Sequence, residues 1–134
     1  MLNIIDALKD FIVNEPNSNI GYLVVDEVLK DEIEKIALER FSETKDLSKY
    51  NLKRIPFTGE FFETLIIEDD ENILNPFFAK QLGKVIQKNR MLILITNLEV
   101  ENIQKIYEPL EFTDFNQIQI GEIEIILLKR WFKW

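Results

Sequence analysis

Three short apolar runs, separated by segments with helical spacing, constrain the fold of this chain more than any other feature. They are Tyr22–Val25, Phe62–Ile67, in which Glu63 and Thr64 are polar, and Met91–Ile95. Runs of this length with little polar alternation are typical of strands that are buried on both faces, as in parallel sheets. Since apolar residues recur three and four apart between them, strands and helices alternate along the chain. This alternation predicts right-handed crossovers and a mostly parallel sheet.

The helical segments carry recognisable start signals. A leading helix is predicted over residues 2–14, where an apolar stripe is followed by Pro16. Two later helices are predicted to begin where a residue that can cap backbone N–H groups precedes an apolar stripe. The predicted caps are Asp26, and Asn75 before Pro76. Thr96 with Asn97 is predicted to begin the turn into a further helix.

The pattern changes from helical spacing to strict alternation near the C-terminus. Isoleucines alternate with glutamines over residues 117–120 and with glutamates over 122–125, which predicts an antiparallel hairpin at about residues 113–131. Gly121 suits the first position of its turn. The whole chain, residues 1–134, is then expected to form a single three-layer α/β domain with a mostly parallel sheet and a C-terminal antiparallel hairpin.

The stretch between the second helix and the second apolar run is the least regular part of the chain. Residues 42–50 are predicted to form a polar surface loop, and Leu52–Ile55 a short strand that ends at Pro56. Neither segment has the composition of a linker, so the expectation of one domain stands.

The amino-acid composition excludes several kinds of chemistry. With no cysteine and no histidine, the chain has no thiol nucleophile, no imidazole base and no zinc site of the usual ligand type. A formal charge of -8 opposes binding to nucleic acids and to anionic membranes. The first ten residues lack a signal-peptide pattern, and no apolar stretch approaches the roughly 20 residues that cross a bilayer. We expect a cytoplasmic protein without a metal site.

The order of elements in the second half of the chain points to a family. From Phe62 to Trp134 the expected order is strand, acidic turn, helix, strand, helix and closing hairpin, with Phe112 just before the hairpin. This order resembles the C-terminal half of class I S-adenosylmethionine-dependent methyltransferases, and Tyr22–Asp26 would be the first strand of that family. The resemblance implies a Rossmann-like, methyltransferase-like sheet.

The turn after that first strand departs from the family pattern. The family has a glycine-rich turn there, which lets the backbone approach S-adenosylmethionine, whereas this chain has Asp26, Glu27 and Val28. Its four glycines never stand two apart, so no GxG cradle can form. The resemblance therefore implies a degenerate domain that has lost cofactor binding. No cofactor is predicted, and S-adenosylmethionine is the ligand to test.

Two further segments each have two interpretations. Asn75, Pro76, Phe77 and Phe78 resemble the NPPF-type motif of amino-methylating members of the family, but a helix cap before a proline explains the same residues. Residues 65–74, LIIEDDENIL, resemble the acidic magnesium pocket of response-regulator receiver domains. We favour a solvated acidic loop before a helix N-terminus, because negative charge is favoured there.

Open α/β sheets bind ligands beyond the carboxyl ends of their strands. The polar residues that follow the predicted strands, together with the caps, therefore form the candidate ligand cleft. These residues are Asp26, Glu27, Glu68, Asp69, Asp70, Asn75, Thr96 and Asn97.

The C-terminal segment is unusual because cationic and aromatic residues crowd together in an acidic chain. Tryptophan and arginine are enriched among residues that dominate binding energy, so Arg130, Trp131, Phe132 and Trp134 are candidate contacts to a protein partner. The alternative is that these rings cover the outer strand or the leading helix. Two functions remain open: a protein-interaction module without catalytic activity, or a small enzyme that uses the carboxylates of the cleft.

Overall fold

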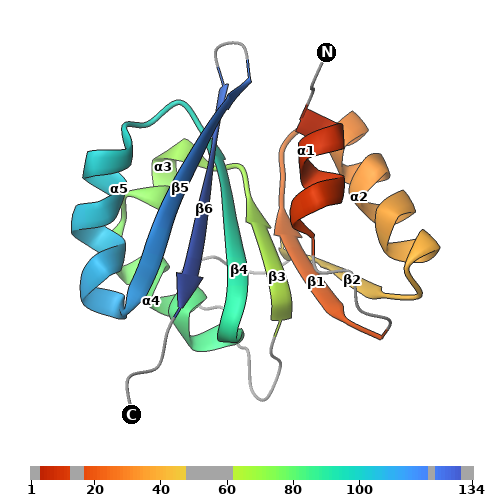
Figure 1. Cartoon of the computed structure of the whole chain (residues 1–134), viewed down its shortest axis with the longest axis horizontal. Helices are drawn as coiled ribbons and strands as arrows, with labels where there is room; N and C mark the ends of the chain where they lie inside the picture. Colours follow the sequence, from red (N-terminus) through yellow and green to blue (C-terminus); the bar gives the residue numbers. More distant parts are fainter. Residues whose placement is uncertain (1–3, 13–16, 48–61, 121–122, 131–134) are drawn as a thin grey trace.

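The structure is a computed structural model that describes residues 4–12, 17–47, 62–120 and 123–130 (Figure 1). Its helices and strands follow one another in an alternating order. They are α1 (Ile4–Phe11), β1 (Asn19–Leu23), α2 (Glu27–Glu39), β2 (Glu43–Asp46), β3 (Phe62–Ile67), α3 (Asp70–Ile73), α4 (Pro76–Val85), β4 (Ile86–Thr96), α5 (Val100–Tyr107), the 3-10 turn η2 (Glu108–Leu110), β5 (Phe112–Ile120) and β6 (Ile123–Arg130).

The strands form one six-stranded sheet in the order β2-β1-β3-β4-β6-β5. The first four strands are parallel, whereas β6 is antiparallel to both β4 and β5. In Figure 1 the sheet separates α1 and α2 from α3, α4 and α5. The three-layer α/β fold with a mostly parallel sheet and a C-terminal antiparallel hairpin, predicted from the sequence, is confirmed.

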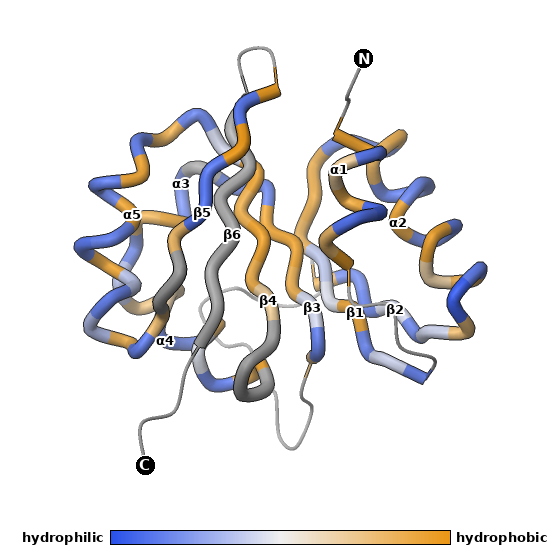
Figure 2. The backbone as a smooth tube through the Cα atoms, viewed as in Figure 1, coloured by the Kyte–Doolittle hydropathy of each residue, from blue (hydrophilic) through white to orange (hydrophobic). Residues whose placement is uncertain are grey.

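Each face of the sheet has its own hydrophobic core. Because side chains alternate along a strand, Leu65 and Ile67 pack under α4 and α5, while Ile66 packs under α1 and α2. In β4, Leu94 packs under α4 and α5, and Ile95 packs under α1 and α2. Figure 2 shows the result as a hydrophobic centre of β1, β3 and β4 between helices of mixed character. Burial on both faces explains why these strands carry apolar runs.

Helix boundaries follow the caps that the sequence indicates. The Asp26 carboxylate accepts from the backbone N–H groups of Val28 and Leu29 at the start of α2. Asn75 accepts in the same way at the start of α4, where Pro76 is the first helical residue. Both predicted caps are confirmed. The leading helix, predicted over residues 2–14, is described as α1 over Ile4–Phe11.

Several boundaries differ from those predicted. Residues 43–46 form strand β2 and not a loop, because their backbone pairs with β1 at the edge of the sheet, where half-exposed polar side chains are tolerated. Strand β1 begins at Asn19 and ends at Leu23, so Val25 lies beyond it and is 76% exposed. The short helix α3 interrupts the predicted acidic loop. The predicted strand Leu52–Ile55 lies outside the described residues.

Side-chain hydrogen bonds tie the helices to each other and to the sheet. Arg40, at the end of α2, donates to the carbonyl oxygens of Lys9 and Ile12 and so satisfies the end of α1. In the opposite layer, the buried Tyr107 hydroxyl donates to the carbonyl oxygen of Ile73 over 2.9 Å. Over the part of the chain that the structure describes, we find no helix with the length and apolar character of a membrane span.

Candidate functional site

The strand order reverses between β1 and β3. The chain leaves β1 toward β2 on one side, whereas β3 and β4 lie on the other side. In open α/β sheets, ligands bind outside the carboxyl ends of the strands at such a switch point. The segments that meet here are the β1–α2 turn, the β3–α3 segment and the end of β4 (Figure 1).

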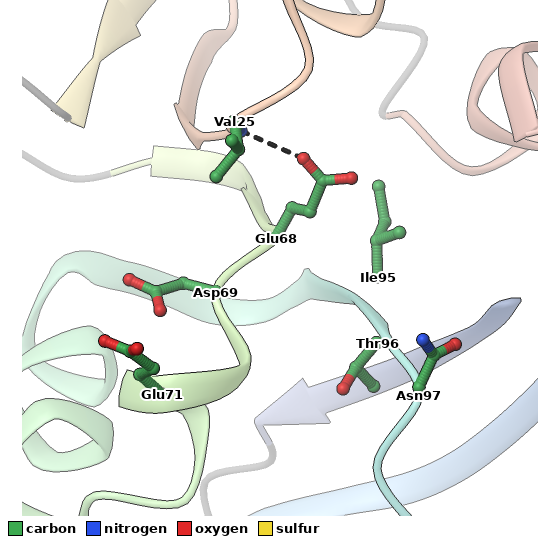
Figure 3. Close-up of a pocket in the computed structure, with 7 residues that line it drawn as sticks. All are labelled: Val25, Glu68, Asp69, Glu71, Ile95, Thr96 and Asn97. Atoms are coloured by element: carbon green, nitrogen blue, oxygen red, sulfur yellow. Dashed lines mark hydrogen bonds between the residues drawn. The ribbon is translucent and has the colours of Figure 1, made fainter.

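Two carboxylates of the chain itself accept hydrogen bonds from backbone N–H groups of the β1–α2 turn. Glu68 follows β3, and its backbone N–H donates to the carbonyl oxygen of Leu23 over 2.7 Å, which extends the pairing of the two strands. The Glu68 side chain then turns toward β1. Its Oε1 accepts from Val25 N at 2.9 Å (Figure 3). The same oxygen accepts from Asp26 N at 3.1 Å. The Asp26 carboxylate accepts from the N–H groups of Val28 and Leu29, so internal carboxylates satisfy four of the N–H groups of this turn.

A pocket of about 300 Å³ lies at the carboxyl ends of β1, β3 and β4. Figure 3 shows Asp69 and Glu71 together on one side of it and Thr96 with Asn97 on the other. The lining residues are Val25, Glu68, Asp69, Glu71, Ile95, Thr96 and Asn97.

A second cavity, which we call the α1–α2 groove, shares Glu68 with this pocket. It measures about 390 Å³ and lies between the starts of α1 and α2 and the end of β5. Its lining is mostly aliphatic, with carboxylates along one side. The lining residues are Ile4, Ile5, Asp26, Val28, Leu29, Glu68 and Ile120.

Two residues of the pocket already have structural roles. Asp69 caps α3, where its carboxylate accepts from the backbone N–H and the side-chain amide of Asn72. Thr96 is buried, and its hydroxyl oxygen accepts from Leu98 N over 3.0 Å, which shapes the turn after β4. Among the residues described here, no group of three or more acidic side chains could hold a metal ion.

The structure brings together only part of the predicted cleft. Four predicted residues line the pocket, and Asp26 lines the α1–α2 groove. Glu27 lines neither cavity; it is exposed and lies 3.4 Å from the Lys30 ammonium. Asn75 also lines neither, since it caps α4. Asp70 begins α3, and its side chain is outside the described part of the structure.

The sequence interpretation missed the apolar members of both cavities. Val25 is predicted to lie in a buried strand but is exposed at the pocket. Ile95 lies in the core, as the predicted central strand implies, and also lines the pocket. Ile4 and Ile120 meet in the groove from opposite ends of the chain, and no local sequence signal indicates that contact. Of the predicted partner contacts, Arg130 ends β6, whereas Trp131, Phe132 and Trp134 lie outside the described residues.

Comparison with solved structures identifies the fold. No protein-family model and no curated protein matches the sequence. Among solved structures, precorrin-6y C5,15-methyltransferase from Geobacter metallireducens GS-15 matches 96% of this chain with a TM-score of 0.65 and 5% identity. Ribosomal protein L11 methylase from Lactobacillus delbrueckii subsp. bulgaricus matches 96% with a TM-score of 0.64 and 12% identity. The chain has the class I methyltransferase fold.

The methyltransferase fold extends over both halves of the chain, although the sequence resemblance was carried mainly by its second half. The two structures just named are themselves covered over 87% and 77% of their length. An O-methyltransferase family protein from Burkholderia thailandensis matches with a TM-score of 0.56 and 10% identity over 86% of this chain and 44% of its own. The chain thus spans about half the length of some methyltransferases that it matches.

Proposed function

We propose that this methyltransferase-fold domain acts as a protein-binding module and does not catalyse methyl transfer. The main support for this proposal is the position of the Glu68 carboxylate, which accepts from the N–H groups of Val25 and Asp26 at the switch point. A cofactor that needed those donors would have to displace an internal carboxylate. It would also meet negative charge from Asp26 in the same turn.

Side-chain bulk at the β1–α2 turn supports the same proposal. A nucleoside approaches this turn closely where glycines leave room for it. Here Asp26 and Glu27 follow Val25, and the Val25 and Val28 side chains are 76% and 64% exposed. Exposed aliphatic side chains beside a cavity suit contact with another protein, because burying them on association is favourable.

The proposed partner is a protein, and the proposed location is the cytoplasm. The charge of -8 opposes nucleic acid and anionic lipid, and the chain has no cysteine for the disulfides of an oxidising compartment. Neither property selects a particular protein partner.

One observation favours a second function. The pocket of about 300 Å³ lies at the switch point and gathers Glu68, Asp69, Thr96 and Asn97 at one place. A small enzyme of this fold would use these groups to hold a substrate and to move a proton. If this enzyme is a methyltransferase, S-adenosylmethionine binding is its first requirement.

A thermal-shift titration with S-adenosylmethionine and S-adenosylhomocysteine separates the two functions. At 100 times its Kd, a ligand of the folded state adds about 2.7 kcal/mol of stability. For a domain of this size that is a rise of Tm on the order of 10 °C. We expect no rise with either compound for the wild-type chain, and a clear rise would overturn the proposed function.

The variant Glu68→Ala provides a second arm of this titration. It removes the carboxylate that accepts from the two N–H groups. Asp26 still caps α2 in this variant and keeps the turn folded. A rise of Tm in this variant alone would identify Glu68 as the group that keeps the cofactor out. A rise in both proteins would favour the enzyme.

A further inference from the structure

The α1–α2 groove combines an aliphatic floor with an acidic rim. Its floor comes from three separate elements, through Ile4 and Ile5 of α1, Val28 and Leu29 of α2, and Ile120 of β5. Val28 is 64% exposed, so its side chain is available to a partner. Figure 1 shows the starts of α1 and α2 beside the upper end of β5, at the carboxyl edge of the sheet.

The charge around the groove is of one sign. Asp26 and Glu68 line it, and Asp69 and Glu71 line the adjoining pocket. Among the described lining residues of both cavities there is no lysine and no arginine. The complementary occupant is therefore a segment in which apolar rings alternate with cations, because rings fill the floor and cations approach the rim.

The chain itself contains a segment of this chemistry. Residues 129–134, KRWFKW, hold three cations, three aromatic residues and no acid, although the whole chain carries a charge of -8. We infer that the α1–α2 groove binds residues 129–134 of a second copy of this chain. This inference rests on the proposed function, because it names the partner of the binding module.

The strand that leads into this segment ends at the edge of the sheet opposite to the groove of the same molecule. Strand β6 runs antiparallel to β4, so Glu124 pairs with Thr96 at the carboxyl edge, whereas Arg130 pairs with Phe112 at the opposite edge. The six residue steps from Glu124 to Arg130 span roughly 20 Å. A second copy can present this segment to the groove without breaking the pairing of β6 with its neighbours.

The resulting contact joins two different surfaces, the groove of one copy and the 129–134 segment of the next. Such a heterologous contact leaves one groove and one segment free in a dimer, so association continues with concentration unless a ring closes. Since cations face carboxylates across it, the contact also weakens as salt screens the charges.

Sedimentation velocity of the 134-residue chain over a range of concentrations tests the inference. We expect the mean mass to rise with concentration and to fall when the ionic strength is raised. The variant Val28→Lys, which places a cation in the groove, is expected to stay monomeric. So is the triple variant Trp131→Ala, Phe132→Ala, Trp134→Ala. Leu38→Lys is the matched control, because Leu38 is 78% exposed on the same helix but does not line the groove.

Mixing the two monomeric variants gives the decisive measurement. Val28→Lys keeps its 129–134 segment and the triple variant keeps its groove, so together they should form a 1:1 dimer and nothing larger. A monomeric wild-type chain at every concentration would overturn the inference, as would a mixture that stays monomeric. Loss of association in Leu38→Lys alone would overturn it too. The thermal-shift result with S-adenosylmethionine judges the proposed function independently of these outcomes.

Discussion

Gly21 shows how closely the strands and helices pack at the scale of one residue. It lies in β1, where an added Cβ would come within 2.7 Å of Leu65 Cδ2 and 3.1 Å of the Phe62 ring. Both neighbours are buried in β3 and belong to the core under α4 and α5. A larger residue would therefore force these side chains out of their packed positions.

We predict that Gly21→Ala lowers the free energy of unfolding by about 1–3 kcal/mol, as overpacking of a core typically does. Alanine restricts the unfolded chain, which offsets up to roughly 1 kcal/mol of that loss. Urea unfolding measures the change. In the double variant Gly21→Ala, Leu65→Val, the shorter side chain makes room for the added methyl group. The loss of stability in the double variant should therefore be smaller than the sum of the losses in the two single variants. Strict additivity would show that the close approach has no energetic effect.

At the scale of single elements, α2 ends in an unusual way. A helix commonly ends at a glycine, which adopts the left-handed conformation without cost. Here that position is Phe41, with φ of 54° and 79% of its surface exposed. In the sequence, Phe41 continues the four-residue spacing of Ile33 and Ala37. The helix stops at Glu39, however, so the Phe41 ring leaves the helical spiral and stays outside the core.

We predict that Phe41→Gly raises the free energy of unfolding by about 1 kcal/mol, the usual cost of a left-handed non-glycine residue. Little burial is lost, since the ring is mostly exposed. Leu38→Gly is the matched control, because Leu38 is equally exposed but lies within the helix. Glycine there should lower stability by about 1 kcal/mol. Thermal or urea unfolding reports both, and a loss of stability in Phe41→Gly would contradict the prediction.

At the scale of the whole molecule, two buried tyrosines connect layers that are distant in sequence. Tyr107 of α5 donates to the Ile73 carbonyl oxygen and packs edge-to-face on Phe112 of β5, with ring centroids 5.6 Å apart. Tyr22 of β1 donates to Glu34 of α2 over 2.6 Å, and Thr44 of β2 donates to the same carboxylate. Burial raises the pKa of the Tyr107 phenol, and burial together with Glu34 raises that of Tyr22.

These raised pKa values predict a loss of stability at alkaline pH. In the unfolded chain both phenols titrate at a pH of about 10. Above that pH the unfolded state releases protons that the native state keeps, so stability is full below it and falls as the pH rises further. Tyr107 alone should contribute a slope of about 1.4 kcal/mol per pH unit. Solvent near the Tyr22 hydroxyl screens part of its contribution.

Urea unfolding between pH 8 and pH 11.5 measures this slope. The comparison protein is Tyr107→Phe, which keeps the ring but removes the titrating hydroxyl. It should be less stable at pH 8 by about 1–3 kcal/mol, because the buried Ile73 carbonyl loses its donor. Its stability should then fall less steeply above pH 10. Equal slopes in the two proteins would contradict the assignment to Tyr107.

Much of the fold is readable from the sequence by itself. The central residues of β3 and β4, Leu65–Ile67 and Leu92–Ile95, are buried on both faces, so they are all apolar and the pattern is local. The caps Asp26 and Asn75 are also local, since a side chain bonds N–H groups two and three residues ahead. The absence of cysteine, histidine and a GxG turn is likewise a property of the sequence alone.

Tertiary structure decided what local pattern cannot encode. Strand β2 forms because its backbone pairs with that of β1, between residues 24 positions apart, and its polar side chains are tolerated at the edge of the sheet. Glu68 looked like any residue of an acidic loop until the sheet placed its carboxylate on the N–H groups of the β1–α2 turn. The groove that joins Ile4 to Ile120 arises for the same reason: side chains remote in sequence become neighbours only when the sheet assembles.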